Sequence, residues 1–107
     1  MAAMLPARWR PVSVRMPETL AELRGPSLGV VVLPVHLTWH GLREFDVSDA
    51  AARHLLYTIL LSQGNRKDIA RFVHPDLLRQ DWPELSALLT SRVRDACARR
   101  FGLGTPA

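Results

Sequence analysis

The sequence is poor in cysteine, lysine and long apolar runs. Cys97 is the single cysteine among 107 residues, so no internal disulfide can form and a reducing compartment is expected. No apolar run approaches the roughly 20 residues that cross a bilayer. Prolines also break the start of the chain, where a signal peptide would need an unbroken apolar segment, at Pro6, Pro11 and Pro17. These absences predict a soluble, cytoplasmic protein with no membrane partner.

The motifs of several enzyme classes are missing as well. There is no glycine-rich phosphate loop, no GxSxG, no HExxH and no pair of cysteines. His36 and His40 are expected on one strand face about 13 Å apart, too far for a zinc ion that holds each ligand at about 2 Å. Cys97 falls among apolar helix positions, which favours an inert buried thiol over a nucleophile. We predict that the chain is not an enzyme and holds no metal or other cofactor.

Positive charge is present but spread along the chain. Thirteen arginines and one lysine against ten acidic residues give a formal charge of +4. This charge permits contact with nucleic acid or with an acidic protein, but no basic block marks out one surface. The composition, 48% apolar and 22% charged, is that of a globular protein, and the length predicts a single domain.

Three segments are expected along the chain. Residues 1–17 contain several prolines and no lasting period, which predicts a flexible, irregular basic arm that Trp9 and Val12 could pin to the domain. Residues 18–102 are expected to form a single globular domain, which opens with one or two helical turns before Gly25. Residues 103–107 are expected to be a tail.

The clearest helical signal lies in residues 48–73. Apolar residues recur there at the i, i+3, i+4, i+7 and i+8 spacing of one helix face, which predicts a core stripe at Ala52, Leu55, Leu56, Ile59 and Leu60. Ser48 is the expected N-cap of this helix. Gly64 is expected to end it in the left-handed conformation, and Asn65 is expected to cap a second apolar helix behind it.

A strand is expected over residues 30–40. Val30 begins a β-branched run, and after Pro34 apolar and polar residues alternate as far as His40. Pro34 cannot donate to a ladder, which indicates an edge position or a bulge. A second short strand near residues 43–47 would complete a hairpin. A lone hairpin needs helices over its apolar side, and the later segments can supply them.

Two short helices are expected after residue 73, at 75–81 and 83–89, because Pro75 and Pro83 both suit a first helical turn. Acidic side chains in this part of the chain are expected at helix starts or on exposed faces. They include Asp76, Asp81 and Glu84.

A last helix is expected after Thr90 or Ser91, either of which can cap it, and Gly102 is expected to end it. Its inner stripe is predicted at Val93, Ala96, Cys97 and Phe101. The predicted fold class is therefore α+β, with a short β-hairpin packed against about four helices after an irregular N-terminal arm.

Residues 60–82 resemble the helix-turn-helix of bacterial regulators. An apolar helix end, a glycine, a polar cap, an [DE]-I-A segment and a second short helix follow one another in LLSQGNRKDIARFVHPDLLRQDW. A DNA-binding role would use the basic and polar residues Arg66, Lys67, Arg71, Arg79 and Gln80. The acidic residues of 75–84 would repel phosphates, and Pro83 would shorten the reading helix. Helix packing alone is the competing interpretation.

A second resemblance covers about residues 33–101. LPVHLTWHGLREFDVSD, YTILLSQGNRKDIARFV, LLRQDWPEL and RVRDACARRF together resemble a family of small bacterial proteins encoded beside nucleotidyltransferase toxins of the abortive-infection class. The shared pattern is a W-x-G turn, an FD-[LV]-SD entry to a helix, a Y-x-[IV]-L core, a glycine and D-[IV]-x-R-[FY]-V. It is matched here by Trp39, Gly41, Phe45 to Asp49, Tyr57 to Leu60, Gly64 and Asp68 to Val73.

These matched residues mainly pack and cap, so the resemblance speaks for the fold more than for an activity. It implies a non-catalytic partner or antitoxin, one that could also regulate transcription, and no catalytic residue carries over. The leading prediction is an antitoxin-like interaction protein, and a DNA-binding regulator is the alternative. Because interfaces favour Trp and Arg anchors, the predicted partner-binding residues are Trp9, Arg10, Trp39 and Trp82, although each tryptophan could equally be partly buried core.

Overall fold

The computed structural model describes residues 11–38 and 41–104. These residues form a short hairpin and a set of helices, which confirms the predicted α+β class. In chain order the elements are α1 (Val12–Arg15), the 3₁₀ turn η3 (Leu20–Glu22), β1 (Val30–Val32), the 3₁₀ turn η4 (Val35–Leu37), β2 (Glu44–Asp46), α2 (Ala50–Gln63), α3 (Arg66–Phe72), α4 (Pro75–Ser86) and α5 (Ser91–Phe101).

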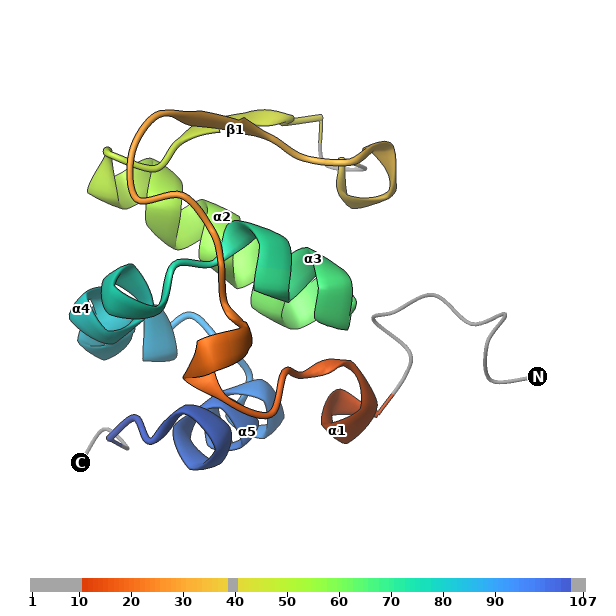
Figure 1. Cartoon of the computed structure of the whole chain (residues 1–107), viewed down its shortest axis with the longest axis vertical. Coiled ribbons are helices and arrows are strands. Elements are labelled where there is room, and N and C mark those ends of the chain that lie inside the picture. The colour runs from red at the N-terminus through yellow and green to blue at the C-terminus, as the bar shows by residue number, and fades with distance from the viewer. Residues whose placement is uncertain (1–10, 39–40, 105–107) are drawn as a thin grey trace.

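The elements are stacked in three levels (Figure 1). The hairpin lies at the top of the view, α2 and α3 lie beneath it with α4 at their lower left, and α5 and α1 lie at the bottom. Helix α2 is central, because it contacts β2, η4, α3 and α4. Within residues 11–38 and 41–104, every helix is too short or too polar to span a bilayer.

Helix α2 confirms the predicted core stripe in part, because Leu56, Ile59 and Leu60 are buried, but its buried face is shifted from the one predicted. Its buried side chains include Arg53, Leu56, Tyr57 and Leu60, whereas Leu55, expected in the core, is 44% exposed. The face is rotated because α2 is covered by the hairpin on one side and by α4 on the other. The predicted stripe assumed a helix that is covered from one side only.

The caps of α2 and α3 follow local sequence signals. Asp49, and not the predicted Ser48, is the N-cap of α2, because its carboxylate accepts a 2.9 Å hydrogen bond from the backbone N–H of Ala52. Asn65 caps α3 as predicted. Its side chain accepts from the N–H of Asp68 at 2.8 Å, and the Asp68 carboxylate accepts from the N–H of Asn65 at 3.2 Å, which completes a capping box.

Gly64 ends α2 for a reason other than the predicted left-handed turn. Its φ of −75° and ψ of 157° are extended, a conformation that any residue can adopt. A side chain is excluded by space instead, because a Cβ here would lie 2.7 Å from the carbonyl oxygen of Leu60. The glycine lets α3 turn back closely against the end of α2.

The hairpin is shorter than predicted. β1 and β2 pair antiparallel with Val31 opposite Phe45, and both of these side chains are buried. The strand expected to reach residue 40 ends at Val32, and the chain turns into η4 after Pro34. Proline lacks the N–H that a ladder needs, and the start of the alternating pattern, Val35–Leu37, lies on a 3₁₀ turn, while residues 39–40 lie outside the described residues.

The two helices expected at 75–81 and 83–89 are one continuous helix, α4. Pro83 lies inside it on the exposed side. The buried stripe runs through the proline unbroken, at Leu78, Asp81, Trp82, Leu85 and Ser86. Burial of this stripe outweighs the hydrogen bond that proline cannot donate, and water can reach the carbonyl left unpaired on the outer side.

Part of the expected arm is ordered, since residues 12–15 form α1 and both Arg15 and Met16 are buried, so the prediction of a flexible, irregular arm is wrong for this stretch. α1 packs on α5, and Met16 is fully buried. Arg15 is 3% exposed, and its guanidinium donates to the carbonyl oxygens of Leu61 at 2.6 Å and Gly64 at 3.3 Å. It thereby satisfies carbonyls at the C-terminal end of α2, where a positive charge is favoured.

Helix α5 matches its prediction. The hydroxyl of Thr90 accepts from the N–H of Val93 at 3.5 Å, and Gly102 ends the helix with a φ of 65°. The predicted inner stripe is buried throughout, at Val93, Ala96, Cys97 and Phe101. An exposed turn here needs the left-handed conformation, which glycine adopts with little steric cost.

Candidate functional site

A buried ion pair joins α2 to α4. Arg53 donates to the carboxylate of Asp81 from Nε at 2.5 Å and from Nη2 at 2.8 Å, and its Nη1 donates to the carbonyl of Val47 at 2.8 Å. These hydrogen bonds to the Asp81 carboxylate raise the pKa of the Arg53 guanidinium. His54 lies at the edge of the pair, with Nε2 3.4 Å from Asp81. The bonds fasten the hairpin and two helices together.

The remaining described histidines hold local structure. His74 is the N-cap of α4, where its Nδ1 accepts from the N–H of Asp76 at 3.1 Å. His36 lies on η4 with Nε2 2.8 Å from the Asp68 carboxylate. His40 lies outside the described residues. Over 11–38 and 41–104, no three side chains of His, Cys, Asp or Glu are grouped so that they could hold a metal ion.

Cys97 and Tyr57 are reactive residue types in unreactive surroundings. Cys97 is fully buried beside Met16, and burial raises the pKa of its thiol to about 12. Burial also raises the pKa of Tyr57, whose hydroxyl accepts from the N–H of His74 at 3.0 Å. The placement of Cys97 on the buried stripe of α5 agrees with its prediction as a buried thiol.

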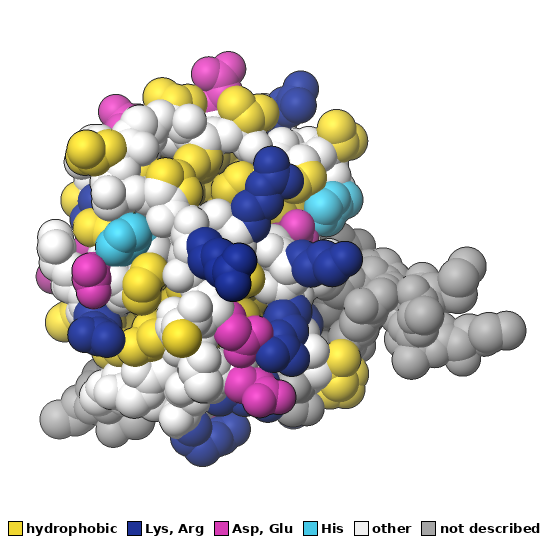
Figure 2. Space-filling view, viewed as in Figure 1, with side chains coloured by type: hydrophobic (Ala, Val, Ile, Leu, Met, Phe, Trp, Pro, Cys, Tyr) yellow, Lys and Arg dark blue, Asp and Glu magenta, His cyan; other side chains and the backbone are white. Residues whose placement is uncertain are grey.

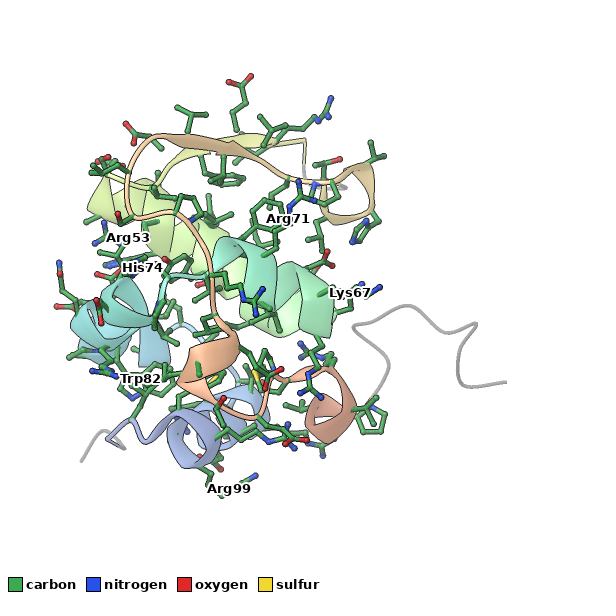
Figure 3. The ribbon with its side chains drawn as sticks, viewed as in Figure 1. Arg53, Lys67, Arg71, His74, Trp82 and Arg99 are labelled. Atoms are coloured by element: carbon green, nitrogen blue, oxygen red, sulfur yellow. The ribbon has the colours of Figure 1, made fainter. Side chains whose placement is uncertain are left out.

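A basic hollow lies between the segment after η3 and the exposed side of α3. Its volume is about 520 Å³, and its lining residues are Glu22, Arg24, Lys67, Ala70 and Arg71. We call it the strap groove, because residues 23–25 lie across α3 like a strap. Figure 2 shows Lys and Arg side chains gathered in the middle of this face, and Figure 3 labels Lys67 and Arg71 on α3.

The five residues predicted to meet DNA do not all line one hollow. Lys67 and Arg71 line the strap groove. Arg66 forms a salt bridge with Glu22, with 2.6 Å between Nη2 of Arg66 and Oε1 of Glu22. Arg79 instead lines a second hollow of about 490 Å³ with Trp82, Pro83, Ser86 and Gly102–Gly104, and Gln80 is exposed on α4. Asp76 and Glu84 are also exposed on α4, as predicted, and they oppose the approach of phosphates to this helix.

The predicted partner-binding residues fall mainly outside the described part of the chain. Trp9, Arg10 and Trp39 lie among residues 1–10 and 39–40 and receive no structural account. Trp82 is 5% exposed, and its Nε1 donates to the carbonyl of Gly104 at 2.5 Å. It belongs to the core beneath the C-terminal segment, which is the competing interpretation of this residue.

The outer side of the hairpin is apolar at β1. Val30 is 59% exposed and Val32 is 52% exposed, and Leu28 and Val35 on either side are each 75% exposed. Their partners across the ladder are acidic, because Asp46 faces Val30 and Glu44 faces Val32. One strand of the hairpin therefore carries apolar side chains outward and the other carries carboxylates.

Three residues of these sites, Arg53, Asp81 and Arg24, were not predicted as such, and the expectation that Asp81 lies at a helix start or on an exposed face is wrong, because it is 3% exposed within α4. Arg53 and Asp81 were detectable, because each lies at helical spacing within the buried stripe of its own helix, with Leu56 and Leu60 and with Leu78 and Leu85. Arg24 had no such signal. Arg24 lies beside α3 because residues 23–25 cross that helix, and the local sequence does not specify this crossing.

Comparisons of the chain with protein-family models, with curated proteins and with solved structures found no match.

Proposed function

We propose that this chain is a non-catalytic interaction protein whose partner docks on the outer side of the β-hairpin. The observation that carries the proposal is the pair of outward valines on β1, Val30 and Val32, each more than half exposed. Exposed β-branched side chains on a strand are costly in water and are covered when another strand or apolar surface packs on them.

The backbone of β1 supports the same surface. The N–H of Leu33 donates to the carbonyl of Arg43 at 2.8 Å, so Leu33 and Arg43 form a hydrogen-bonded pair in the register of the hairpin. Ladder bonds in an antiparallel pair fall on alternate residues, so the N–H and C=O groups of Val30 and Val32 point away from β2. A partner strand can add to this edge by main-chain hydrogen bonds, with its apolar side chains beside the valines.

The opposite edge is less suited to pairing. Glu44 and Asp46 on β2 are exposed, and charged residues on an edge strand discourage the addition of another strand. A partner strand is therefore expected at β1 and not at β2. The resemblance of residues 33–101 to small proteins encoded beside abortive-infection nucleotidyltransferases makes such a toxin the partner to test, with this chain as its antitoxin.

Co-expression tests this proposal directly. The chain is expressed with any nucleotidyltransferase that is found to be encoded beside its gene, and growth and co-purification are measured. We expect relief of growth arrest and a stable complex. Val30→Lys combined with Val32→Lys should abolish both, because two charges on the edge prevent strand addition. Leu88→Lys, on an exposed leucine after α4, is the matched control and should bind normally.

The proposal fails if growth arrest is unrelieved and no complex is purified. The hairpin is rejected as the docking surface if the double lysine variant binds as tightly as the unaltered chain. Circular dichroism melts of each variant establish that a loss of binding does not come from unfolding, because the substituted side chains are exposed and should change stability little.

A DNA-binding regulator is the second candidate function. It is supported by the cations that gather around α3, Arg24, Lys67 and Arg71, and opposed by the acidic side chains exposed on α4. A gel-shift series with the promoter of its own gene at several salt concentrations tests it. Binding dominated by phosphates must weaken steeply as salt rises, and the absence of a shift at low salt would end this candidate.

A further inference from the structure

We propose that the strap groove is a binding site for phosphate groups, carried by a nucleotide or by a nucleic-acid backbone. The inference deepens the second candidate function, since it names the cations that would meet DNA. It does not depend on the hairpin surface or on base reading by α4.

The groove holds an excess of positive charge. Glu22 is its one acidic lining residue, and this carboxylate is occupied by Arg66, which donates from Nε at 2.8 Å and approaches with Nη2 at 2.6 Å. Those hydrogen bonds lower the pKa of Glu22, so it remains a partner of Arg66. Over the described residues, Arg24, Lys67 and Arg71 make no salt bridge. A bound dianion would relieve the repulsion among these three cations.

The backbone of Arg24 and the guanidinium of Arg71 are held in place before any ligand arrives. The strap is fixed by hydrogen bonds from the N–H of Arg24 to the carbonyl of Ala70 at 2.7 Å and from the N–H of Gly25 to the carbonyl of Val73 at 2.9 Å. The guanidinium of Arg71 stacks over the ring of Phe72, 4.9 Å from its centroid. Cations that are already positioned lose less conformational entropy when they bind an anion.

The approach of the strap is enforced by a glycine. A Cβ on Gly25 would lie 2.3 Å from the carbonyl carbon and oxygen of Phe72, so only glycine lets the strap lie directly on the end of α3. This contact sets Arg24 beside Lys67 and Arg71, although it is more than forty residues away from them in the sequence. Lys67 and Arg71 are four residues apart on α3 and therefore share one helix face.

The floor and size of the groove suit a phosphate-bearing ligand. Ala70 contributes only a methyl group between the cations, and the volume of about 520 Å³ lies within the range of about 300–1,000 Å³ of small-molecule sites. Two guanidinium groups and one ammonium group supply several charge-assisted donors. A phosphate, with its several acceptor oxygens, uses this set more fully than a single carboxylate does.

The experiment measures binding of three probes to the full chain at low and moderate salt. Inorganic pyrophosphate is titrated by calorimetry, and a fluorescent 20-base-pair duplex and a fluorescent hexaglutamate peptide are followed by anisotropy. The groove variants are Arg24→Gln, Lys67→Gln, Arg71→Gln and Ala70→Glu. Arg92→Gln and Arg99→Gln, exposed positions on α5, are controls with the same loss of charge as the three glutamine variants. Thermal melts confirm that each variant folds.

We expect pyrophosphate to bind, each glutamine substitution in the groove to weaken binding about tenfold, and Ala70→Glu to abolish it. If the duplex also binds, each substitution should reduce the salt slope of its affinity by about one. The controls should bind like the unaltered chain. Binding of pyrophosphate without binding of the duplex supports the groove and rejects the DNA-binding candidate.

Other outcomes overturn the inference. Failure of pyrophosphate to bind at low salt rejects the groove as a phosphate site. So does equal weakening by the α5 controls, which would mark a general charge effect. Duplex binding that survives every groove substitution places DNA elsewhere and leaves the second candidate standing without this site. Tighter binding of hexaglutamate than of pyrophosphate would assign the groove to an acidic protein segment instead.

Discussion

Arg53 and Asp81 form a bidentate ion pair between α2 and α4, with both residues at most 5% exposed. The third guanidinium nitrogen of Arg53 bonds to the carbonyl of Val47, just after β2. A single side chain therefore links the hairpin to two helices. Burial of two charges is tolerated here because both partners are present and their donors and acceptors are matched.

Breaking this pair should destabilise the protein strongly. Asp81→Asn leaves the buried guanidinium of Arg53 without its counter-charge, and we expect the free energy of unfolding to fall by about 3–5 kcal/mol in urea titrations. Replacing both partners, with Arg53→Met and Asp81→Leu, should recover much of that loss, since no charge is then left buried. A loss below about 1 kcal/mol in the single variant would contradict this account.

Gly25 is the second sensitive position. Gly25→Ala places a Cβ within 2.6 Å of three backbone atoms of Phe72 and Val73, and backbone yields less readily than a side chain. We expect a loss of at least about 2 kcal/mol in the free energy of unfolding. Gly104→Ala is the matched control, because a Cβ there meets nothing within 4 Å. Equal effects of the two substitutions would show that the strap can move away from α3.

Pro83→Ala should stabilise the protein. Alanine restores the backbone N–H inside α4, and proline in a helix interior is unfavourable by about 3 kcal/mol relative to alanine. Part of this gain is offset because the unfolded chain also becomes more flexible. We expect a net gain of about 1–2 kcal/mol, measured as a rise in the thermal midpoint. A fall in the midpoint would mean that the proline ring makes contacts that matter more than the hydrogen bond.

The thiol of Cys97 should make stability depend on alkaline pH. Burial raises its pKa from 9.0 to about 12, so the folded state keeps its proton where the unfolded state has lost it. Between pH 9 and 12 the unfolded state binds fewer protons, and the contribution of Cys97 to stability therefore falls with rising pH by up to about 1.4 kcal/mol per unit. Below pH 9 this contribution is constant.

The difference between the unaltered chain and Cys97→Ala isolates the effect from other groups that titrate at high pH. We expect the free energies of unfolding of the two proteins to converge as the pH rises above 9. A difference that stays constant from pH 8 to pH 11 would show that the thiol is as accessible to water in the folded state as in the unfolded state.

Sequence predicted those elements whose signals are local. Asn65, Thr90 and Gly102 begin or end helices through contacts within a few residues, and the structure confirms all three. The strand beyond Pro34 and the break at Pro83 were wrong for opposite reasons. Alternating polarity did not sustain a strand without a ladder partner, and a proline did not end a helix whose buried stripe continued.

The candidate sites depend on contacts that no local pattern carries. The strap groove forms only because the segment with Arg24 lies across α3. The outward direction of the β1 backbone groups follows from the hydrogen-bonded pair of Leu33 and Arg43. The sequence could place β-branched residues in a strand, but not state which of them face water. The rotated core face of α2 has the same origin, since it reflects which neighbours cover the helix.

Met16, near the start of the described residues, touches Cys97 on the last helix with 3.8 Å between sulfurs, across 81 positions of chain. Arg100 reinforces the contact by donating to the carbonyl of Met16 at 2.6 Å. Contacts that span so much of a chain form late and slow folding. During synthesis on the ribosome, α1 must wait for α5 to emerge before its apolar side is covered. Until then the apolar side chains of the nascent N-terminal segment are exposed and offer a binding site to chaperones.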